Sequence, residues 1–242
     1  DNYYNTAREG IVISRMVWDA LLYRDPKTNE YLPNLATSYK WVDSKTLEFD
    51  LRKGVKFHNG EKFDADDVVF TMNYMGNPDN GAKPARNVNW WENAEKLGEY
   101  KVRLNLKKEF PAALEFLSGP LVIYPNEYYA KVGPEGMALE PVGTGPYAVT
   151  SVEPGKRYKF KKYDGHHDGS PKGKANIGNI VIRTIAESNT QLAELFSGGI
   201  DWIWKVKPDQ AERIGAQGAF TVKNSSTMRI GYLNFDAMGR HS

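Results

Sequence analysis

The stretch of sequence that decides the fold is residues 46–75, TLEFDLRKGVKFHNGEKFDADDVVFTMNYM. At its start, Leu47, Phe49 and Leu51 alternate with polar residues, and this period of two predicts a strand with one buried face. The Asn-Gly pair at 59–60 is a turn signal. The stretch therefore predicts a strand, a turn and, from the apolar spacing that follows, a helix.

Three carboxylates stand at the start of that helix. Asp64 lies three residues before Asp67, which resembles a capping box with Asp in place of the usual Glu or Gln. Together with Asp66 they could also form a metal or acid/base cluster. Carboxylates in a first helical turn accept hydrogen bonds from free N–H groups and complement the helix dipole. Helix capping is therefore favoured over a metal or acid/base site.

Away from this stretch, helical and strand patterns alternate along the chain. The predicted helices cover residues 13–21, 111–117, a segment starting at 125, 188–197 and 208–214. The predicted strands cover residues 102–106, 147–152, 158–163, 180–185, 200–205, 220–223 and 228–235. Residues 76–91, rich in Gly, Pro and Asn and ending in two tryptophans, are predicted to form a long loop. These patterns indicate a mixed α+β or α/β chain.

Composition excludes several classes of protein. The 242 residues carry 32 Lys+Arg against 30 Asp+Glu, a net charge of +2, so no strong field favours nucleic acid or an acidic membrane surface. The lack of cysteine excludes disulfides, thiolate nucleophiles and thiolate metal sites. No run approaches the roughly 18 apolar residues of a membrane span, and residue 1 opens no signal peptide. We expect a mature or cut form, or a cytoplasmic protein.

The usual catalytic motifs do not occur in the sequence. Residues 143–146 (GTGP) lack the third glycine and the Lys-Ser/Thr pair of a phosphate loop and are predicted to form a rigid turn before a strand. No Gly-x-Ser-x-Gly elbow and no His-Glu-x-x-His run is present. Binding is therefore favoured over catalysis, and the aromatic residues, 12% of the chain, are the expected contacts.

The histidines offer one candidate metal site. His166 and His167 are adjacent and are flanked by Asp164 and Asp168. Adjacent residues in extended chain point apart, and the surrounding glycines indicate an exposed turn. A solvated turn is therefore favoured over a metal site. His58, in another turn, is predicted to be structural.

Residues 51–60 (LRKGVKFHNG) and 63–70 (FDADDVVF) resemble motifs of the family 5 extracellular solute-binding proteins. These proteins are the dipeptide- and oligopeptide-binding components of ABC importers, and related receptors take nickel complexes, oligosaccharides or opines. Further similar segments lie in family order at residues 18–22, 32–36, 141–147, 198–201 and 232–235. Residues 163–167 (YDGHH) depart from the family's Asn-Pro-x-Tyr-Trp segment, which is mainly structural, so the departure puts no function in doubt.

The resemblance implies a lobe of the periplasmic-binding-protein type (type II, cluster C), with mixed sheets flanked by helices and with the second lobe absent. Residues 1–35 would begin the lobe, 36–140 would form an inserted subdomain, and 141–242 would continue the lobe. Two such lobes close over a solute around a hinge and present the closed form to a membrane permease. One lobe alone leaves sheet edges and apolar faces uncovered, so we expect this fragment to self-associate.

The function that the resemblance implies is delivery of a peptide or other small solute to the permease of an ABC importer. The expected location is the periplasm or the cell exterior, with membrane association in Gram-positive bacteria. A receptor for a sugar, an opine or a nickel complex is the alternative on the same fold. A sensory or chaperone-like binding protein and a small-peptide hydrolase are rivals from other classes. No catalytic residue, metal ligand or cofactor is expected, and no nucleic acid partner.

The residues expected to contact the ligand come from an N-terminal segment and from two tryptophan pairs. They are Thr6, Ala7, Arg8, Glu9, Gly10, Trp90, Trp91, Trp202 and Trp204. The N-terminal segment is chosen by its position in the family, and the pairs by their places in the long loop and in the strand predicted at 200–205. For Trp202 and Trp204, packing in the core and contact with the ligand are equally supported, because only one face of a strand can line a cleft.

Overall fold

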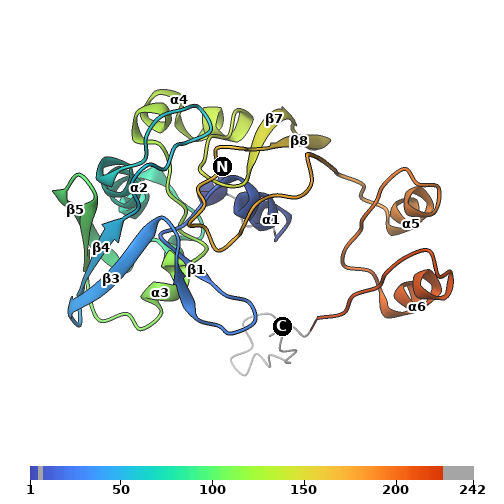
Figure 1. Ribbon diagram of the computed structural model, residues 1–242, viewed down its shortest axis with the longest axis horizontal. Helices are drawn as coiled ribbons and strands as arrows, with labels where there is room; N and C mark the ends of the chain where they lie inside the picture. Colours follow the sequence, from blue (N-terminus) through green and yellow to red (C-terminus); the bar gives the residue numbers. More distant parts are fainter. Residues whose placement is uncertain (5–7, 226–242) are drawn as a thin grey trace, which may run out of the picture. The chain divides into compact units, whose positions relative to one another are not determined.

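The computed structural model describes residues 1–4 and 8–225 of the chain. Two compact units make up the chain, Asp1–Thr184 and Ile185–Ser242, hereafter the first and the second unit (Figure 1). No helix in the described ranges has both the length and the apolar character that crossing a membrane requires. The expected mixed α/β class is confirmed by the strands and helices that follow one another through the first unit.

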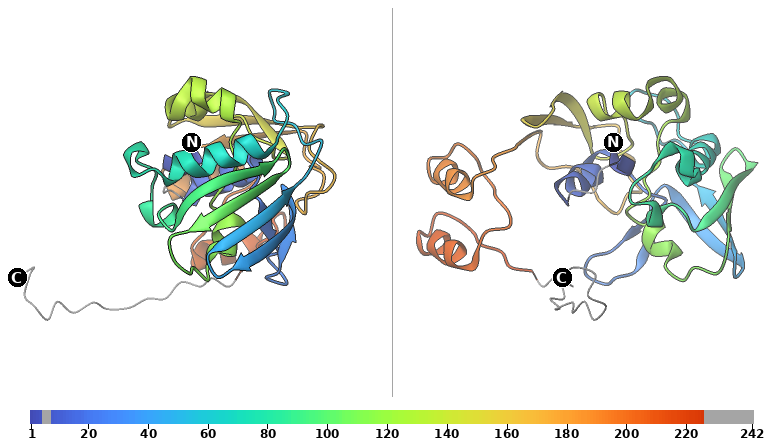
Figure 2. Two further views of the ribbon diagram at one scale, coloured as in Figure 1. Left: turned by 90° about the vertical axis from the view of Figure 1, so that its left-hand side faces the viewer. Right: turned by 180° about the vertical axis from the view of Figure 1, so that it is seen from behind.

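A four-stranded antiparallel sheet organises the first unit. Its order is β3 (Ala36–Asp43), β4 (Thr46–Leu51), β6 (Lys101–Leu106) and β5 (Trp91–Gly98). The predicted alternation is confirmed in β4, where Leu47, Phe49 and Leu51 are buried, and β6 buries every second residue in the same way. Helix α2 (Ala65–Gly76) packs across β5 and β6 (Figure 2). The strand, turn and helix predicted for residues 46–75 are therefore the centre of this layer.

The start of α2 is capped by the carboxylates that predict it. The Asp64 side chain accepts a hydrogen bond from Asp66 N, and the Asp67 side chain accepts one from Asp64 N, both at 2.9 Å. Asp67 also accepts a hydrogen bond from Asn126 N at 2.9 Å, which joins α2 to α4 (Asn126–Leu139). Burial of Asp67 raises its pKa to about 7. The capping interpretation of Asp64 and Asp67 is confirmed.

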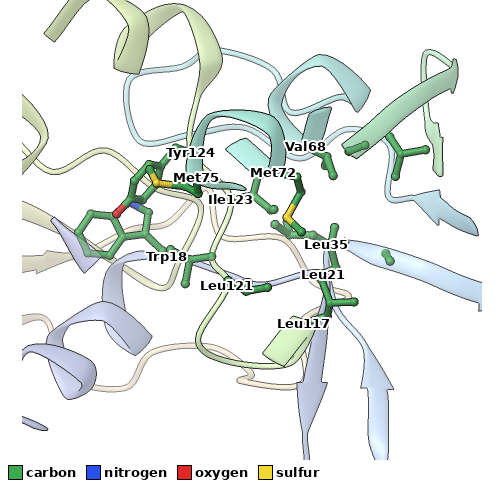
Figure 3. Close-up of a cluster of buried hydrophobic side chains, with 14 of the residues drawn as sticks. Trp18, Leu21, Leu35, Val68, Met72, Met75, Leu117, Leu121, Ile123 and Tyr124 are labelled. Carbon is green, nitrogen blue, oxygen red and sulfur yellow. The ribbon is translucent and has the colours of Figure 1, made fainter. Parts of the chain in front are cut away.

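The core beneath α2 brings together segments that are far apart in the chain (Figure 3). Its buried side chains come from α2, from the chain after α1 (Arg8–Val17), and from α3 (Ala113–Leu117) with the residues that follow it. They include Trp18, Leu21, Leu35, Val68, Met72, Met75, Leu117, Leu121, Ile123 and Tyr124. The core therefore ties the N-terminal 35 residues to the four-stranded sheet.

Smaller elements complete this part of the first unit. They are η1 (Asn2–Tyr4), the hairpin of β1 (Leu22–Arg24) and β2 (Tyr31–Pro33), η2 (Pro78–Asn80) and η3 (Ala85–Asn87). The helices predicted at 13–21, at 111–117 and from 125 correspond to α1, α3 and α4. Helix α1 ends earlier than predicted, at Val17, and α4 is kinked at Gly133, where φ is +64° and Pro134 follows. A positive φ and a proline both break helical geometry.

A three-stranded antiparallel sheet ends the first unit. Its order is β7 (Tyr147–Glu153), β8 (Arg157–Lys162) and β9 (Asn179–Arg183), and all three strands are predicted from the sequence. The loop of residues 163–178, hereafter the 163–178 loop, joins β8 to β9 and returns to the N-terminal segment, because Lys172 Nζ donates a hydrogen bond to Trp18 O at 2.8 Å. This return builds the site described below.

The second unit contains α5 (Ser188–Phe196) and α6 (Pro208–Ala216), both predicted from the sequence. The strands predicted at 200–205 and 220–223 are wrong, since neither segment pairs with another strand among the described residues. An alternating pattern forms a strand only where a neighbouring strand accepts and donates the ladder hydrogen bonds. The strand predicted at 228–235 lies outside the described residues.

The domain segments expected from the sequence can be compared with the two units. All strands of the four-stranded sheet fall within residues 36–140, the segment expected to be an inserted subdomain. The boundary between the two units, at residues 184 and 185, lies inside the segment expected at 141–242.

Candidate functional site

Asp19 lies between α1 and β1 and is fully buried. Its Oδ1 is 2.7 Å from Lys172 Nζ, and its Oδ2 accepts a hydrogen bond from Thr144 Oγ1 at 3.0 Å. Burial opposes ionisation of Asp19, but the positive charge of Lys172 and the polar side chains around the carboxylate together outweigh burial and hold the pKa of Asp19 well below its usual range. Asp19 is therefore a buried carboxylate anion held in one orientation.

Lys172 uses all of its N–H bonds at this site. Besides the contact with Asp19, Nζ donates hydrogen bonds to Arg15 O at 2.7 Å and to Trp18 O at 2.8 Å. These carbonyls belong to the end of α1 and the residue after it, so the ammonium fastens the 163–178 loop to that end. Lys172 and the Asn34 amide, which donates at 3.3 Å, occupy Oδ1 of Asp19, and Oδ2 faces Thr144 and the two histidines.

The Gly-Thr-Gly-Pro stretch packs directly on the backbone at the end of α1. A Cβ added to Gly143 would lie 2.1 Å from Val17 O, and Gly145 N donates a hydrogen bond to Val17 O at 2.9 Å. His58 braces the same stretch: its Nδ1 accepts from Gly143 N at 3.3 Å, and its Nε2 lies 2.9 Å from Gly145 O. Burial lowers the pKa of His58. The predicted structural role of His58 and the predicted rigid turn into a strand are both confirmed.

His166 and His167 are not solvated, contrary to the prediction. Only 6% of the His166 side chain and 7% of the His167 side chain are exposed. Their Nε2 atoms lie 3.8 Å and 3.6 Å from Asp19 Oδ2. His166 Nε2 and both ring nitrogens of His167 are buried without a hydrogen-bond partner. No local pattern predicted this burial, because Asp19 lies far from the histidines in the sequence and Lys172 stands in a loop without a regular pattern.

A pocket of about 610 Å³ opens beside the histidines. Its lining includes His166, His167 and four basic residues, and the basic residues are Arg52, Lys53, Lys162 and Lys174. Arg52 closes one side by donating to Asn34 O at 2.8 Å and to Gly169 O at 3.2 Å. The two histidine side chains are therefore buried, and they border a charged pocket that opens to solvent. Asp19, His166 and His167 are the described residues whose ligand atoms could hold a metal ion, since these atoms lie within 4.8 Å of one another.

The expected loop position of Trp91 is wrong, and both tryptophans at the end of that segment are buried. Trp91 begins β5 and is 1% exposed, while Trp90 is 4% exposed. Trp91 Nε1 donates to Met72 O at 3.0 Å, and Trp90 stacks on Phe110 with ring centroids 4.7 Å apart. Trp91 thus packs against α2 and Trp90 against Phe110, and almost none of either side chain is left exposed to a ligand.

Trp202 and Trp204 lie in the irregular chain between α5 and α6. Trp202 is 68% exposed, Trp204 is half-buried, and their ring centroids are 5.4 Å apart. Lys205 Nζ lies 5.9 Å from the centroid of the Trp204 ring, within the range of a cation–π contact. The sequence analysis left core packing open for this pair. Among the described residues, Trp202 is not packed in a core.

The N-terminal residues expected to contact a ligand are only partly described. Arg8 begins α1, and Glu9 and Gly10 lie in its first turn. Thr6 and Ala7 lie outside the described residues.

Comparison with known families identifies the chain. The family model for bacterial extracellular solute-binding proteins, family 5, matches residues 30–239. The chain belongs to this family. The expected resemblance is thus confirmed over most of the chain, including the 163–178 loop that carries the histidines.

Individual relatives of this family member are longer proteins. It is 27% identical over 210 residues to the oligopeptide-binding protein AppA of Bacillus subtilis, covering 84% of this chain and 38% of AppA. It is 30% identical over 173 residues to the glutathione-binding protein GsiB of Salmonella paratyphi A, covering 70% of this chain and 32% of GsiB. The structure of NikA from Brucella suis in complex with Fe(III)-EDTA matches with a TM-score of 0.78 and 27% identity, over 91% of this chain and 45% of NikA. The chain thus spans less than half the length of each, and the lobe expected from the sequence has the fold of these binding proteins.

Proposed function

We propose that this protein is the solute receptor of an ABC importer and that its solute is peptide-like. The family match over residues 30–239 carries the proposal, and relatives named for oligopeptides and for glutathione favour a peptide over a sugar or an opine. Receptors of this kind trap a solute between two lobes and hand it to a permease. The chain supplies most of one lobe, and the remaining contacts come from a second lobe.

The tryptophan pair of the second unit, in which Trp202 is exposed and Trp204 half-buried, supports a binding role. Large aromatic side chains are normally covered in a folded protein, and an aromatic face left in solvent is a common ligand contact. Trp202 offers an exposed apolar face, and the neighbouring Trp204 ring, tilted by 54° from it, carries the ammonium of Lys205 over its own face. We assign Trp202 and Trp204 to solute contact, together with residues 6–10, whose place in the family supports the same role.

The location and the partner follow from the same proposal. A receptor of this family works outside the cytoplasmic membrane, in the periplasm or at the surface of a Gram-positive cell. Its partner there is the importer's permease, which recognises the closed form of both lobes.

The experiment uses the full-length protein. Mass spectrometry of ligand released from the purified protein identifies the solute class, and a thermal-shift panel of peptides, sugars, opines and metal chelates ranks the solutes. We expect peptides to raise the melting temperature and to remain intact on chromatography. Turnover of the peptides would identify a hydrolase instead, and a shift confined to another solute class would overturn the peptide assignment while keeping the receptor.

Metal chelates are in the panel for a specific reason. The structure of NikA, which this chain matches at 27% identity, holds Fe(III)-EDTA. A thermal shift with a chelate and with no peptide would make this protein a receptor for metal complexes.

A further inference from the structure

We propose that Asp19, His166 and His167 form a binding site for one divalent transition-metal ion of the Zn²⁺ type. The site is built from residues of the first unit, whereas Trp202 and Trp204 belong to the second unit, and its test does not depend on which solute the protein carries. The observation behind it is the convergence of two uncommitted imidazoles on one carboxylate oxygen inside the first unit.

The distances from the two histidines to Asp19 Oδ2 do not fit hydrogen bonds, whereas Thr144 Oγ1 lies within hydrogen-bond range of the same oxygen. The Nε2 atoms of His166 and His167 lie 3.8 Å and 3.6 Å away, beyond the range of an N–H···O hydrogen bond. Two ligands bound to one Zn²⁺ at about 2.0–2.2 Å in tetrahedral geometry lie roughly 3.3 Å apart. The two Nε2–Oδ2 separations are therefore within about 0.5 Å of metal-ligand spacing.

The polar atoms of the cluster are left in need of a partner. Both histidine side chains are more than nine-tenths buried, and His166 Nε2 and both nitrogens of His167 make no hydrogen bond. A buried polar group without a partner costs free energy, and such groups are few in native structures. One bound cation would satisfy the two Nε2 atoms at once.

The surroundings orient the carboxylate as a ligand. Thr144 Oγ1 donates to Oδ2 and Lys172 Nζ lies on Oδ1, so the carboxylate cannot turn. Ligating carboxylates in metal sites are held by such outer hydrogen bonds. The ammonium of Lys172 also repels a cation, so we expect an affinity on the order of 1–10 μM rather than that of a closed structural zinc site.

Nitrogen and oxygen donors together select a borderline ion over Mg²⁺ or Ca²⁺, which prefer oxygen alone. Three protein ligands leave a fourth position for water or a solute group. His166 and His167 belong to the lining of the pocket of about 610 Å³, so the proposed site borders a space that opens to solvent. Residues 164–169 carry two glycines, and a shift of this backbone can bring the three ligand atoms, which lie within 4.8 Å of one another, to metal-ligand spacing.

The test is calorimetric titration of chelator-treated full-length protein with ZnCl₂, repeated with MgCl₂. We expect Zn²⁺ to bind at about 1–10 μM and Mg²⁺ not to compete. His166→Gln and His167→Gln should each weaken Zn²⁺ binding at least about tenfold, because each removes one of three ligands. Asp168→Asn is the matched control, since Asp168 is next to His167 but exposed and paired with Lys174, and this variant should bind as the parent does.

A second readout separates ligation from loss of fold. Co²⁺ in the parent protein should give visible absorption bands of a nitrogen- and oxygen-bound ion, and the bands should disappear in His167→Gln while its melting temperature stays within a few degrees of the parent's. Absence of Zn²⁺ binding at 100 μM would overturn the proposal. Binding that survives both histidine substitutions would overturn it as well, because the ion would then lie elsewhere.

Discussion

Two pairs of tryptophans in this chain have opposite surroundings. Trp90 and Trp91 in the first unit are 4% and 1% exposed, and their indole N–H groups donate to the backbone oxygens of Asn87 and Met72. Trp202 and Trp204 in the second unit lie in irregular chain, and Trp202 is 68% exposed. The first pair is packed within the fold, whereas Trp202 of the second pair keeps most of its side chain in solvent. Burial and satisfied hydrogen bonds, rather than residue type, separate a core aromatic from a contact aromatic.

The largest effect that tests this difference is on stability. Trp91→Ala should lower the free energy of unfolding by about 3–5 kcal/mol, because it empties a fully buried site and leaves Met72 O without its donor. Urea denaturation of the full-length protein measures the change. Near-parental stability would mean that Trp91 is not packed between α2 and the sheet.

Two ion pairs differ in burial in the same way: Asp19 with Lys172 is buried, and Asp168 with Lys174 is exposed. Asp19→Asn should destabilise the protein by about 3 kcal/mol, because the largely buried ammonium of Lys172 loses its carboxylate. Asp168→Asn, at an exposed ion pair with Lys174, should change stability by less than about 0.5 kcal/mol. Equal effects of the two substitutions in urea denaturation would contradict the burial of Asp19.

A pH profile tests burial at a third place, the start of α2. The folded state raises the pKa of Asp67 to about 7, so Asp67 holds its proton to a higher pH when folded than when unfolded. Its contribution to stability is present in full below about pH 4 and is lost as the pH rises through 7.

Asp67→Asn does not titrate, and the measurement is the melting temperature of parent and variant from pH 4 to 8. The parent should lose stability relative to the variant across this range. The amide keeps one acceptor oxygen for the two backbone N–H groups of Asp64 and Asn126, which adds an offset that does not change with pH. A constant difference between the two proteins across the range would show that Asp67 is ionised throughout.

The smallest change in the free energy of unfolding is expected for Trp202, the exposed member of the second pair. Trp202→Ala should change the free energy of unfolding by less than about 0.5 kcal/mol, because most of the side chain is already in solvent. Thermal unfolding beside Trp91→Ala measures both. A loss as large as that of Trp91→Ala would place Trp202 in a core.

Local signals in the sequence predicted the parts of the fold that local interactions determine. The alternation of β4 and the capping of α2 by Asp64 and Asp67 each depend on residues within a few positions of one another. The same alternation at residues 200–205 predicted a strand that does not form, because the pattern does not show whether a partner strand exists.

The candidate site depends on long-range contacts, and the sequence did not predict it. His166 and His167 were interpreted as a solvated turn because their glycine-rich neighbours favour one. Their burial follows from Asp19, and from Lys172, whose bond to Trp18 O joins residues 154 positions apart. The family motifs placed the fold correctly, but they gave no sign of this cluster, since residues 163–167 depart from the family pattern.

The central proposal, that this protein is a solute receptor and that the exposed Trp202 contacts the solute, is tested most directly by one titration. The solute released from the purified full-length protein is titrated into the parent and into Trp202→Ala. We expect the parent to bind it without turnover and the variant to bind at least about tenfold more weakly, by at least about 1.4 kcal/mol, at an unchanged melting temperature. Equal affinity in both proteins would contradict the role assigned to Trp202, and a parent that binds no solute, or converts it, would contradict the receptor itself.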